Sequence, residues 1–186
     1  MGVKSAYVEQ GATFSADRQF RYGLWRTWKK DALKGFKQGS FSHAGFVLWI
    51  MLNPSTADEH VLDPTLRRCE GYSLEWGFDG FVVCNLFAFR STDPDVLLTT
   101  KRLGLDIIGP DNDATITKYG VRAARIVAGW GSLKYSGIED RARIVERLLF
   151  ECGRHMFCLG ENLDRSPKHP LYLSKKRQLR SYATVL

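Results

Sequence analysis

The stretch FVLWIMLNPST at residues 46–56 decides the fold. Its seven apolar residues, 46–52, fit a strand that is buried on both faces, as strands of parallel sheets are. Asn53-Pro54-Ser55 then ends the strand, because proline has no N–H to donate to a neighbouring strand and asparagine and serine favour turns. In open α/β sheets, ligands bind where the carboxyl ends of the strands meet. We therefore expect the polar residues after Leu52 to belong to a functional site.

The rest of the chain repeats this alternation of buried strand and amphipathic helix. Asp63-Pro64-Thr65 and Asp111-Asn112-Asp113 are typical helix starts, and Gly77 and Gly120 are typical stops. Asp93-Pro94 is expected to end a long loop. Further strands are predicted over 81–86, 125–131 and 156–159, and helices over 63–76, 111–119 and 139–151.

This order predicts an α/β fold with three layers, α/β/α, and a mostly parallel central sheet of about four strands. Residues 20–28 partly alternate apolar and polar side chains, so we expect them to add an antiparallel strand at one edge. The 186 residues, 44% of them hydrophobic, predict one domain. Its expected parts are an N-terminal edge extension (1–40), a core (41–174) and a basic tail (175–186), which is either solvated or in contact with phosphates.

Charge and composition narrow the function classes. Lys and Arg number 27 against 20 Asp and Glu, a net charge of +7, which favours an anionic partner such as nucleic acid, with an ordinary basic surface as the alternative. No apolar run is long enough to span a membrane, and the first residues do not resemble a secretion signal, so we expect a cytoplasmic protein without a membrane partner.

Several familiar sites are missing from the sequence. It contains no phosphate-binding G-x-x-x-x-G-K-S/T loop, no G-x-G-x-x-G after the first strand and no G-x-S-x-G elbow, which disfavours nucleoside triphosphatases and esterases. The cysteines and histidines lack zinc-site spacing, so no metal site is predicted. Three of the four cysteines (Cys69, Cys84, Cys152 and Cys158) lie within apolar patterns, so buried thiols are expected rather than disulfides.

Five motifs run through nearly the whole chain in a fixed order. They are MLNPSTAD at 51–58, DPT at 63–65, CNLFA at 84–88, AGWG at 128–131 and PKHPLY at 167–172. Together they resemble the bacterial and phage family called domain of unknown function 1643. More distantly, the order of Asn53-Pro54-Ser55, Asn85, Trp130-Gly131 and His169-Pro170-Leu171 is similar to that of uracil-DNA glycosylases. This second resemblance implies a uracil-DNA glycosylase-like fold and a hydrolase, without metal or organic cofactor, that cleaves the N-glycosidic bond of a base flipped out of DNA.

The resemblance implies a catalytic role for three residues. His169 would donate a hydrogen bond to the carbonyl oxygen of the departing base, where negative charge develops. Asn53 would orient the attacking water, and Asp63, or Asp58, would supply a carboxylate. The alternatives are a loop histidine before proline for His169 and a helix N-cap for Asp63.

Other residues would bind the substrate. Asn85 would read the base edge, because an amide both donates and accepts; a cap of the strand end is the alternative. Phe87 and Tyr172, with Phe89 as a further candidate, would stack on the base unless they belong to the core. Phosphate contacts are expected from Ser55, Arg67, Arg68, Arg90 and Lys168, with ordinary exposed side chains as the alternative.

Two other functions stay open at this point. One is a non-catalytic module that binds a modified base or a nucleotide, and the other is a small-molecule nucleoside hydrolase or transferase. A DNA partner predicts a basic strip beside the motif edge, whereas a small-molecule enzyme needs only an enclosed pocket. The sequence leaves the oligomeric state open.

Overall fold

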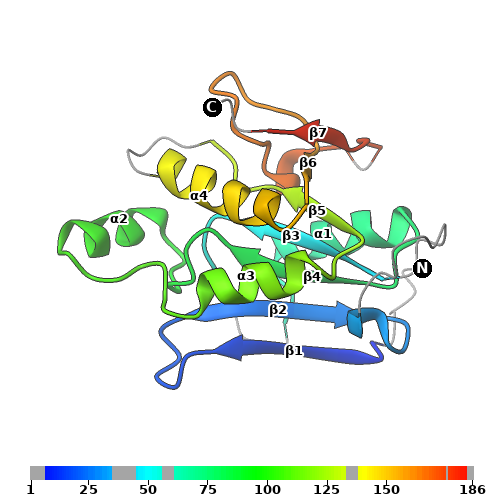
Figure 1. The fold of residues 1–186 in the computed structure, drawn as a ribbon, viewed down its shortest axis with the longest axis horizontal. Helices are drawn as coiled ribbons and strands as arrows, with labels where there is room; N and C mark the ends of the chain where they lie inside the picture. The colour runs from blue at the N-terminus through cyan, green and yellow to red at the C-terminus, as the bar shows by residue number, and fades with distance from the viewer. Residues whose placement is uncertain (1–6, 35–44, 56–60, 133–137, 175, 184–186) are drawn as a thin grey trace.

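The computed structural model describes residues 7–34, 45–55, 61–132, 138–174 and 176–183. These residues form an α/β fold around a seven-stranded sheet with the strand order β1-β2-β4-β3-β5-β6-β7, so the predicted class is confirmed (Figure 1). The strands are β1 (Glu9–Phe14), β2 (Arg21–Thr27), β3 (Phe46–Met51), β4 (Gly80–Asn85), β5 (Arg125–Ala128), β6 (Met156–Cys158) and β7 (Arg180–Tyr182). The helices are α1 (Pro64–Glu75), α2 (Pro94–Arg102), α3 (Asn112–Gly120) and α4 (Ile138–Glu151), with 3-10 turns η1 (Ala32–Lys34) and η2 (Pro170–Tyr172).

The centre of the sheet consists of the four predicted parallel strands. β4 pairs with one side of β3 and β5 with its other side, and β6 pairs with the outer side of β5. Every residue of β3 and β4 is buried, which explains why both read as continuous apolar runs. Because these strands are parallel, their carboxyl ends lie at one edge.

Antiparallel strands extend the sheet at both sides. β2, predicted over 20–28, pairs with β4, and β1 lies beyond it. β7 pairs with β6 at the far side, so Tyr182 of the predicted basic tail is buried in the core. Neither β1 nor β7 was predicted, because short edge strands are held by pairing with distant residues and carry a weak local pattern.

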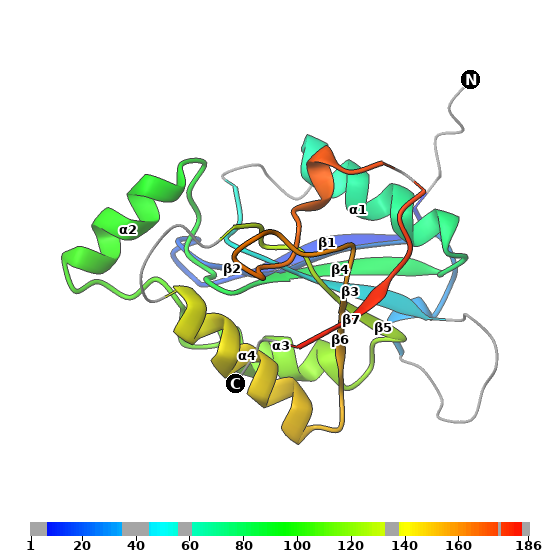
Figure 2. The ribbon, with the colours of Figure 1, turned by 90° about the horizontal axis from the view of Figure 1, so that it is seen from above.

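Helices cover both faces of the sheet, which gives the predicted three layers (Figure 2). On one face, α1 packs Leu66, Cys69 and Tyr72 against side chains of β3 and β4. α3 and α4 cover the other face. Sequence reasoning missed α2, although its Asp93 is an N-cap whose side chain accepts a hydrogen bond from the N–H of Asp95.

The chain leaves β3 toward α1 on one face and leaves β5 toward α4 on the other. The topological switch point, where α/β proteins bind their ligands, therefore lies between the ends of β3 and β5. None of the helices in the described part of the chain is long and apolar enough to cross a membrane. Three cysteines are buried as expected, but Cys152 follows the last turn of α4 and is exposed, so that part of the prediction is wrong.

Candidate functional site at the carboxyl edge

The carboxyl edge brings together residues that are far apart in sequence. The loops after β3 and β4 continue side by side, because the N–H groups of Leu86 and Phe87 donate to the carbonyls of Met51 and Leu52 at 2.8 and 3.0 Å. Asn53 therefore follows a strand end next to that of Asn85. From the other side, the segment that carries His169 packs on the end of β5.

Two glycines after β5 allow this close approach. Gly131 has a φ of +83°, which favours glycine, and a Cβ there would lie 3.4 Å from the Cβ of His169. A Cβ on Gly129 would lie 3.3 Å from Cδ of Pro170 and 3.1 Å from Sδ of Met51. Gly129 and Gly131 thus place His169 against the end of β5, beside β3.

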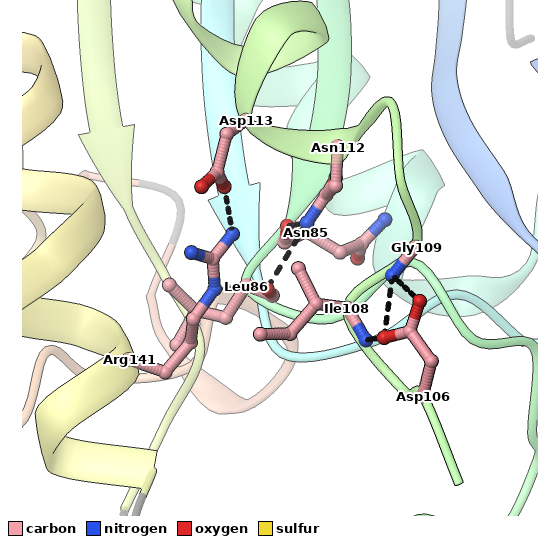
Figure 3. Close-up of polar contacts among 8 residues, drawn as sticks. All are labelled: Asn85, Leu86, Asp106, Ile108, Gly109, Asn112, Asp113 and Arg141. Atoms are coloured by element: carbon pink, nitrogen blue, oxygen red, sulfur yellow. Dashed lines mark hydrogen bonds and ion pairs between the residues drawn. The ribbon is translucent and has the colours of Figure 1, made fainter.

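A buried polar network holds the end of β4 (Figure 3). Nδ2 of Asn112, at the start of α3, donates to the carbonyls of Asn85 and Leu86, both at 3.1 Å. Nε of Arg141, in α4, donates to the Leu86 carbonyl at 2.8 Å, and its guanidinium also pairs with Asp113. Side chains of α3 and α4, on one face of the sheet, therefore hold the backbone at Asn85 and Leu86.

The side chain of Asn85 is left with an unused donor. It is 2% exposed, and its Nδ2 has no hydrogen-bond partner among the described residues. Phe81 and Val83 pack on the α1 side, and the alternation of β4 directs Asn85 to that side as well. An unpaired buried donor costs about 1–3 kcal/mol, so it is typical of a site that a ligand completes.

Asn53 and Ser55 organise the loop after β3. Nδ2 of Asn53 donates to the Ser91 carbonyl at 2.9 Å, which ties this loop to the one after β4. Oγ of Ser55 donates to Oδ2 of Asp63 at 3.2 Å, while Oδ1 of Asp63 accepts from the N–H of Leu66 at 2.8 Å. Asp63 is therefore the N-cap of α1, which was the alternative to a catalytic carboxylate in the sequence analysis.

His169 sits at the start of η2 in a defined protonation form. Its Nδ1 accepts a hydrogen bond from the N–H of Leu171 at 3.3 Å, so the proton of the neutral ring is on Nε2. Burial lowers the pKa of His169 below the usual 6.5, against the opposing effect of the Asp63 carboxylate. At neutral pH His169 is therefore an uncharged ring with an N–H available as a donor.

The turn before His169 has its own polar network, which sequence reasoning missed. Asp164 accepts hydrogen bonds from the hydroxyls of Ser132 and Ser166, both at 2.5 Å. The Asn162 side chain donates to Oγ of Ser166 at 3.0 Å. Asp164 thereby joins the residues after β5 to the turn that leads to His169. The polar cluster Asn162 to Ser166 was the available signal, because such residues favour turns.

The predicted stacking and phosphate residues are more dispersed. Phe87 is 2% exposed and belongs to the core on the α3 and α4 side, whereas Tyr172 is 86% exposed with its ring 6.3 Å from that of His169. Arg68 donates to the Pro170 carbonyl at 3.4 Å and so braces η2 against α1. The remaining candidates donate hydrogen bonds to nearby groups. Arg67 donates to the Leu62 carbonyl, Arg90 to the Arg18 carbonyl and Lys168 to Oδ1 of Asn162. Asp58 lies outside the described residues.

Arg21 is a buried cation that the sequence did not single out. It is the first residue of β2 and is 2% exposed. Its backbone N–H donates to the Ala88 carbonyl at 2.9 Å. Burial lowers its pKa to about 10, while the Asp63 carboxylate acts in the opposite direction. Arg21 therefore adds positive charge near the Asp63 side of the site.

Within the described ranges, no three His, Cys, Asp or Glu side chains are grouped so that they could hold a metal ion. The fold and these residues define an α/β protein with a polar site at the carboxyl edge of its parallel strands. The chain belongs to the family described as "Protein of unknown function (DUF1643)", which matches residues 21–171. No curated protein and no solved structure was found to match it.

Proposed function

We propose that this protein is a DNA base-processing hydrolase, similar to uracil-DNA glycosylases, which cleaves the N-glycosidic bond of a flipped base. One observation carries the proposal: a neutral histidine donor, His169, and a buried amide with an unused donor, Asn85, lie at the same edge of the sheet. The order of motifs that resembles uracil-DNA glycosylases supports it. We place the activity in the cytoplasm.

Base recognition is assigned to Asn85. Its free Nδ2–H donates to a base carbonyl, and its Oδ1 accepts from an adjacent ring N–H. The backbone at Asn85 is held by Asn112, so its amide is preorganised and loses little entropy on binding. A base without the matching carbonyl leaves this buried donor unpaired, which is a strong basis for discrimination.

Bond cleavage is assigned to His169. When the C1′–N bond breaks, its electron pair stays on the base and negative charge develops on the base carbonyl oxygen. The Nε2–H of His169 donates to that oxygen, so its hydrogen bond is strongest in the transition state. A neutral ring suits this role because Nδ1 accepts the N–H of Leu171, which leaves Nε2–H as the donor for the base carbonyl.

Water completes the reaction on the sugar. Oδ1 of Asn53 accepts a hydrogen bond from the attacking water, and the carboxylate of Asp63 stabilises the positive charge that develops at C1′. The water oxygen bonds to C1′, and the proton it loses ends on the departed base. The products are an abasic site and the free base, so no other reactant is needed.

Positive charge supports DNA as the partner. The chain has a net charge of +7, and Arg67, Arg68, Arg90 and Lys168 are the candidates for phosphate contacts. Each phosphate contact releases counterions, so affinity for an oligonucleotide should fall steeply with salt.

The test uses oligonucleotides that carry uracil, mismatched bases and a panel of modified bases, single- and double-stranded. After incubation, heating in alkali breaks the strand at each abasic site. We expect strand breaks at one base type with the wild-type chain and far fewer in the same time with His169→Asn, in which an asparagine still caps η2 but lacks Nε2–H. Binding without any abasic site would overturn the catalytic proposal in favour of a base-binding module, and free nucleosides cleaved in place of DNA would indicate a small-molecule enzyme.

A further inference from the structure

A second surface of the molecule lies between α4 and strands β6 and β7. It contains a cavity of about 800 Å³ with a mainly apolar lining, to which Ile144, Phe150, Met156 and Tyr182 contribute. These residues belong to α4, β6 and β7, and the proposed hydrolase does not use them. Two of them project into solvent: Ile144 is 48% exposed and Phe150 is 63% exposed.

The exposed residues of α4 lie on one side of the helix. Exposed residues recur three or four positions apart and so form one stripe. The stripe consists of Asp140, Arg143, Ile144, Arg147, Phe150 and Glu151. Arg143 pairs with Asp140 at 2.5 Å and Arg147 pairs with Glu151 at 2.9 Å, so both guanidinium groups are held along the stripe. Arg154, just after the helix, lines the same cavity.

We propose that this surface joins two copies of the chain, with the two α4 helices antiparallel and crossing at Arg147. In that arrangement, residues equally far from Arg147 on either side face each other. Ile144 and Phe150, three positions before and after it, then form an apolar pair. Arg143 meets Glu151 of the second copy. At the crossing point, Arg147 meets Arg147 of the second copy, and each is paired with Glu151 of its own chain.

This self-complementarity argues for a second copy rather than another partner. A two-fold interface uses the same patch on both subunits, so each residue of the patch must suit its opposite. The stripe meets this condition for the apolar pair Ile144–Phe150 and for the oppositely charged pair Arg143–Glu151. The like charges of the two Arg147 side chains at the crossing point are each offset by Glu151 of the same chain. A parallel arrangement would instead set Arg143 against Arg143 and Glu151 against Glu151. The apolar residues would supply the affinity, and the charges would fix the direction of the helices.

The oligomeric state in solution tests the proposal. Light scattering after gel filtration, from about 1 to about 100 μM chain, should show a wild-type dimer. Phe150→Glu should raise the dimer dissociation constant at least about tenfold, because it replaces one member of the apolar pair with a charge. Leu103→Glu, at an exposed leucine directly after α2, is the matched control and should leave the dimer unchanged.

Charge exchange tests the direction of the helices. Arg143→Glu alone and Glu151→Arg alone should each weaken the dimer, and the double variant should restore it, because the Glu and Arg then face each other again. Circular dichroism confirms that each variant keeps its helices. A wild-type chain of single-chain mass at all concentrations, a dimer that Phe150→Glu leaves intact, or a double variant as weak as the singles would each overturn the proposal.

Discussion

The two halves of the candidate site are held in different ways. At the end of β4, the side chains of Asn112 in α3 and Arg141 in α4 donate hydrogen bonds to backbone carbonyls, and both side chains are buried. Before His169, the turn is held mainly by hydrogen bonds among its own residues, centred on the exposed Asp164. The first half is built into the core of the fold, whereas the second depends on a turn whose central residue, Asp164, is exposed.

Because of this difference, we expect substitutions in the two halves to affect folding stability and catalysis to different extents. The backbone at Asn85, to which we assign base recognition, is part of the packed core, so altering its support should destabilise the whole chain. The turn before His169 is supported at the exposed Asp164, so altering that support should change catalysis more than folding. The predictions below follow this division from the largest effect to the smallest.

Replacing Arg141 should have the largest effect on stability. Arg141→Met removes a buried, charge-assisted hydrogen bond to the Leu86 carbonyl and the pairing with Asp113, so we expect the free energy of unfolding to fall by about 2–3 kcal/mol. Urea denaturation followed by tryptophan fluorescence measures it. Arg102→Met, at an exposed end of α2, is the control and should stay within about 0.5 kcal/mol. Equal losses for the two variants would show that the network does not support the core.

Replacing Asn112 should have the next largest effect. Asn112→Ala removes both hydrogen bonds from its side chain and leaves the Asn85 carbonyl without this donor, a loss of about 1–2 kcal/mol. Because the Leu86 carbonyl keeps its bond from Arg141, this loss should be smaller than that of Arg141→Met. The reverse order in the same denaturation experiment would contradict the larger contribution that we expect from Arg141.

Asp164 should behave in the opposite way. Asp164→Ala removes hydrogen bonds from Ser132 and Ser166, but at an exposed position, so the free energy of unfolding should change by less than about 1 kcal/mol. The rate of base excision should nevertheless fall several-fold, because the turn no longer holds His169 in place. A large loss of stability with an unchanged rate would erase the contrast between the two halves.

The smallest effect concerns pH. Burial lowers the pKa of His169 below 6.5 in the folded chain, so as the pH falls through that value the unfolded chain takes up a proton that the folded chain does not. Stability must therefore decrease toward acid. Unfolding curves from about pH 7 to about pH 5 should fall more steeply for the wild type than for His169→Asn. Parallel curves would mean that this ring is not buried as described.

Much of the fold was predictable because burial leaves a strong pattern. The strands β3, β4, β5 and β6 read as apolar runs, and α1 begins at a proline after an N-cap aspartate, so their places followed from local sequence. β7 did not, because Arg180-Ser181-Tyr182 has no local pattern and becomes a strand only by pairing with β6.

The site was predictable to a different extent. The common edge of Asn53, Asn85 and His169 could be predicted, because each follows a recognisable element or motif and the carboxyl ends of parallel strands share an edge; their roles in binding and catalysis stay predictions. The supports of these residues were not found. Arg141 and Asn112 read as ordinary polar residues of helices, and only the packing of α3 and α4 under β4 brings them to the Leu86 carbonyl.

The most direct test of the central claim is the single-turnover rate of His169→Asn on the oligonucleotide that the wild type cleaves. We expect that rate to fall by about 10²–10³, while the dissociation constant for the oligonucleotide changes less than about threefold, because the histidine bond strengthens only as the base departs. His155→Asn, an exposed histidine away from the carboxyl edge, should cleave at the wild-type rate. A His169→Asn chain that also cleaves at the wild-type rate would contradict the account and leave His169 as a capping residue of η2.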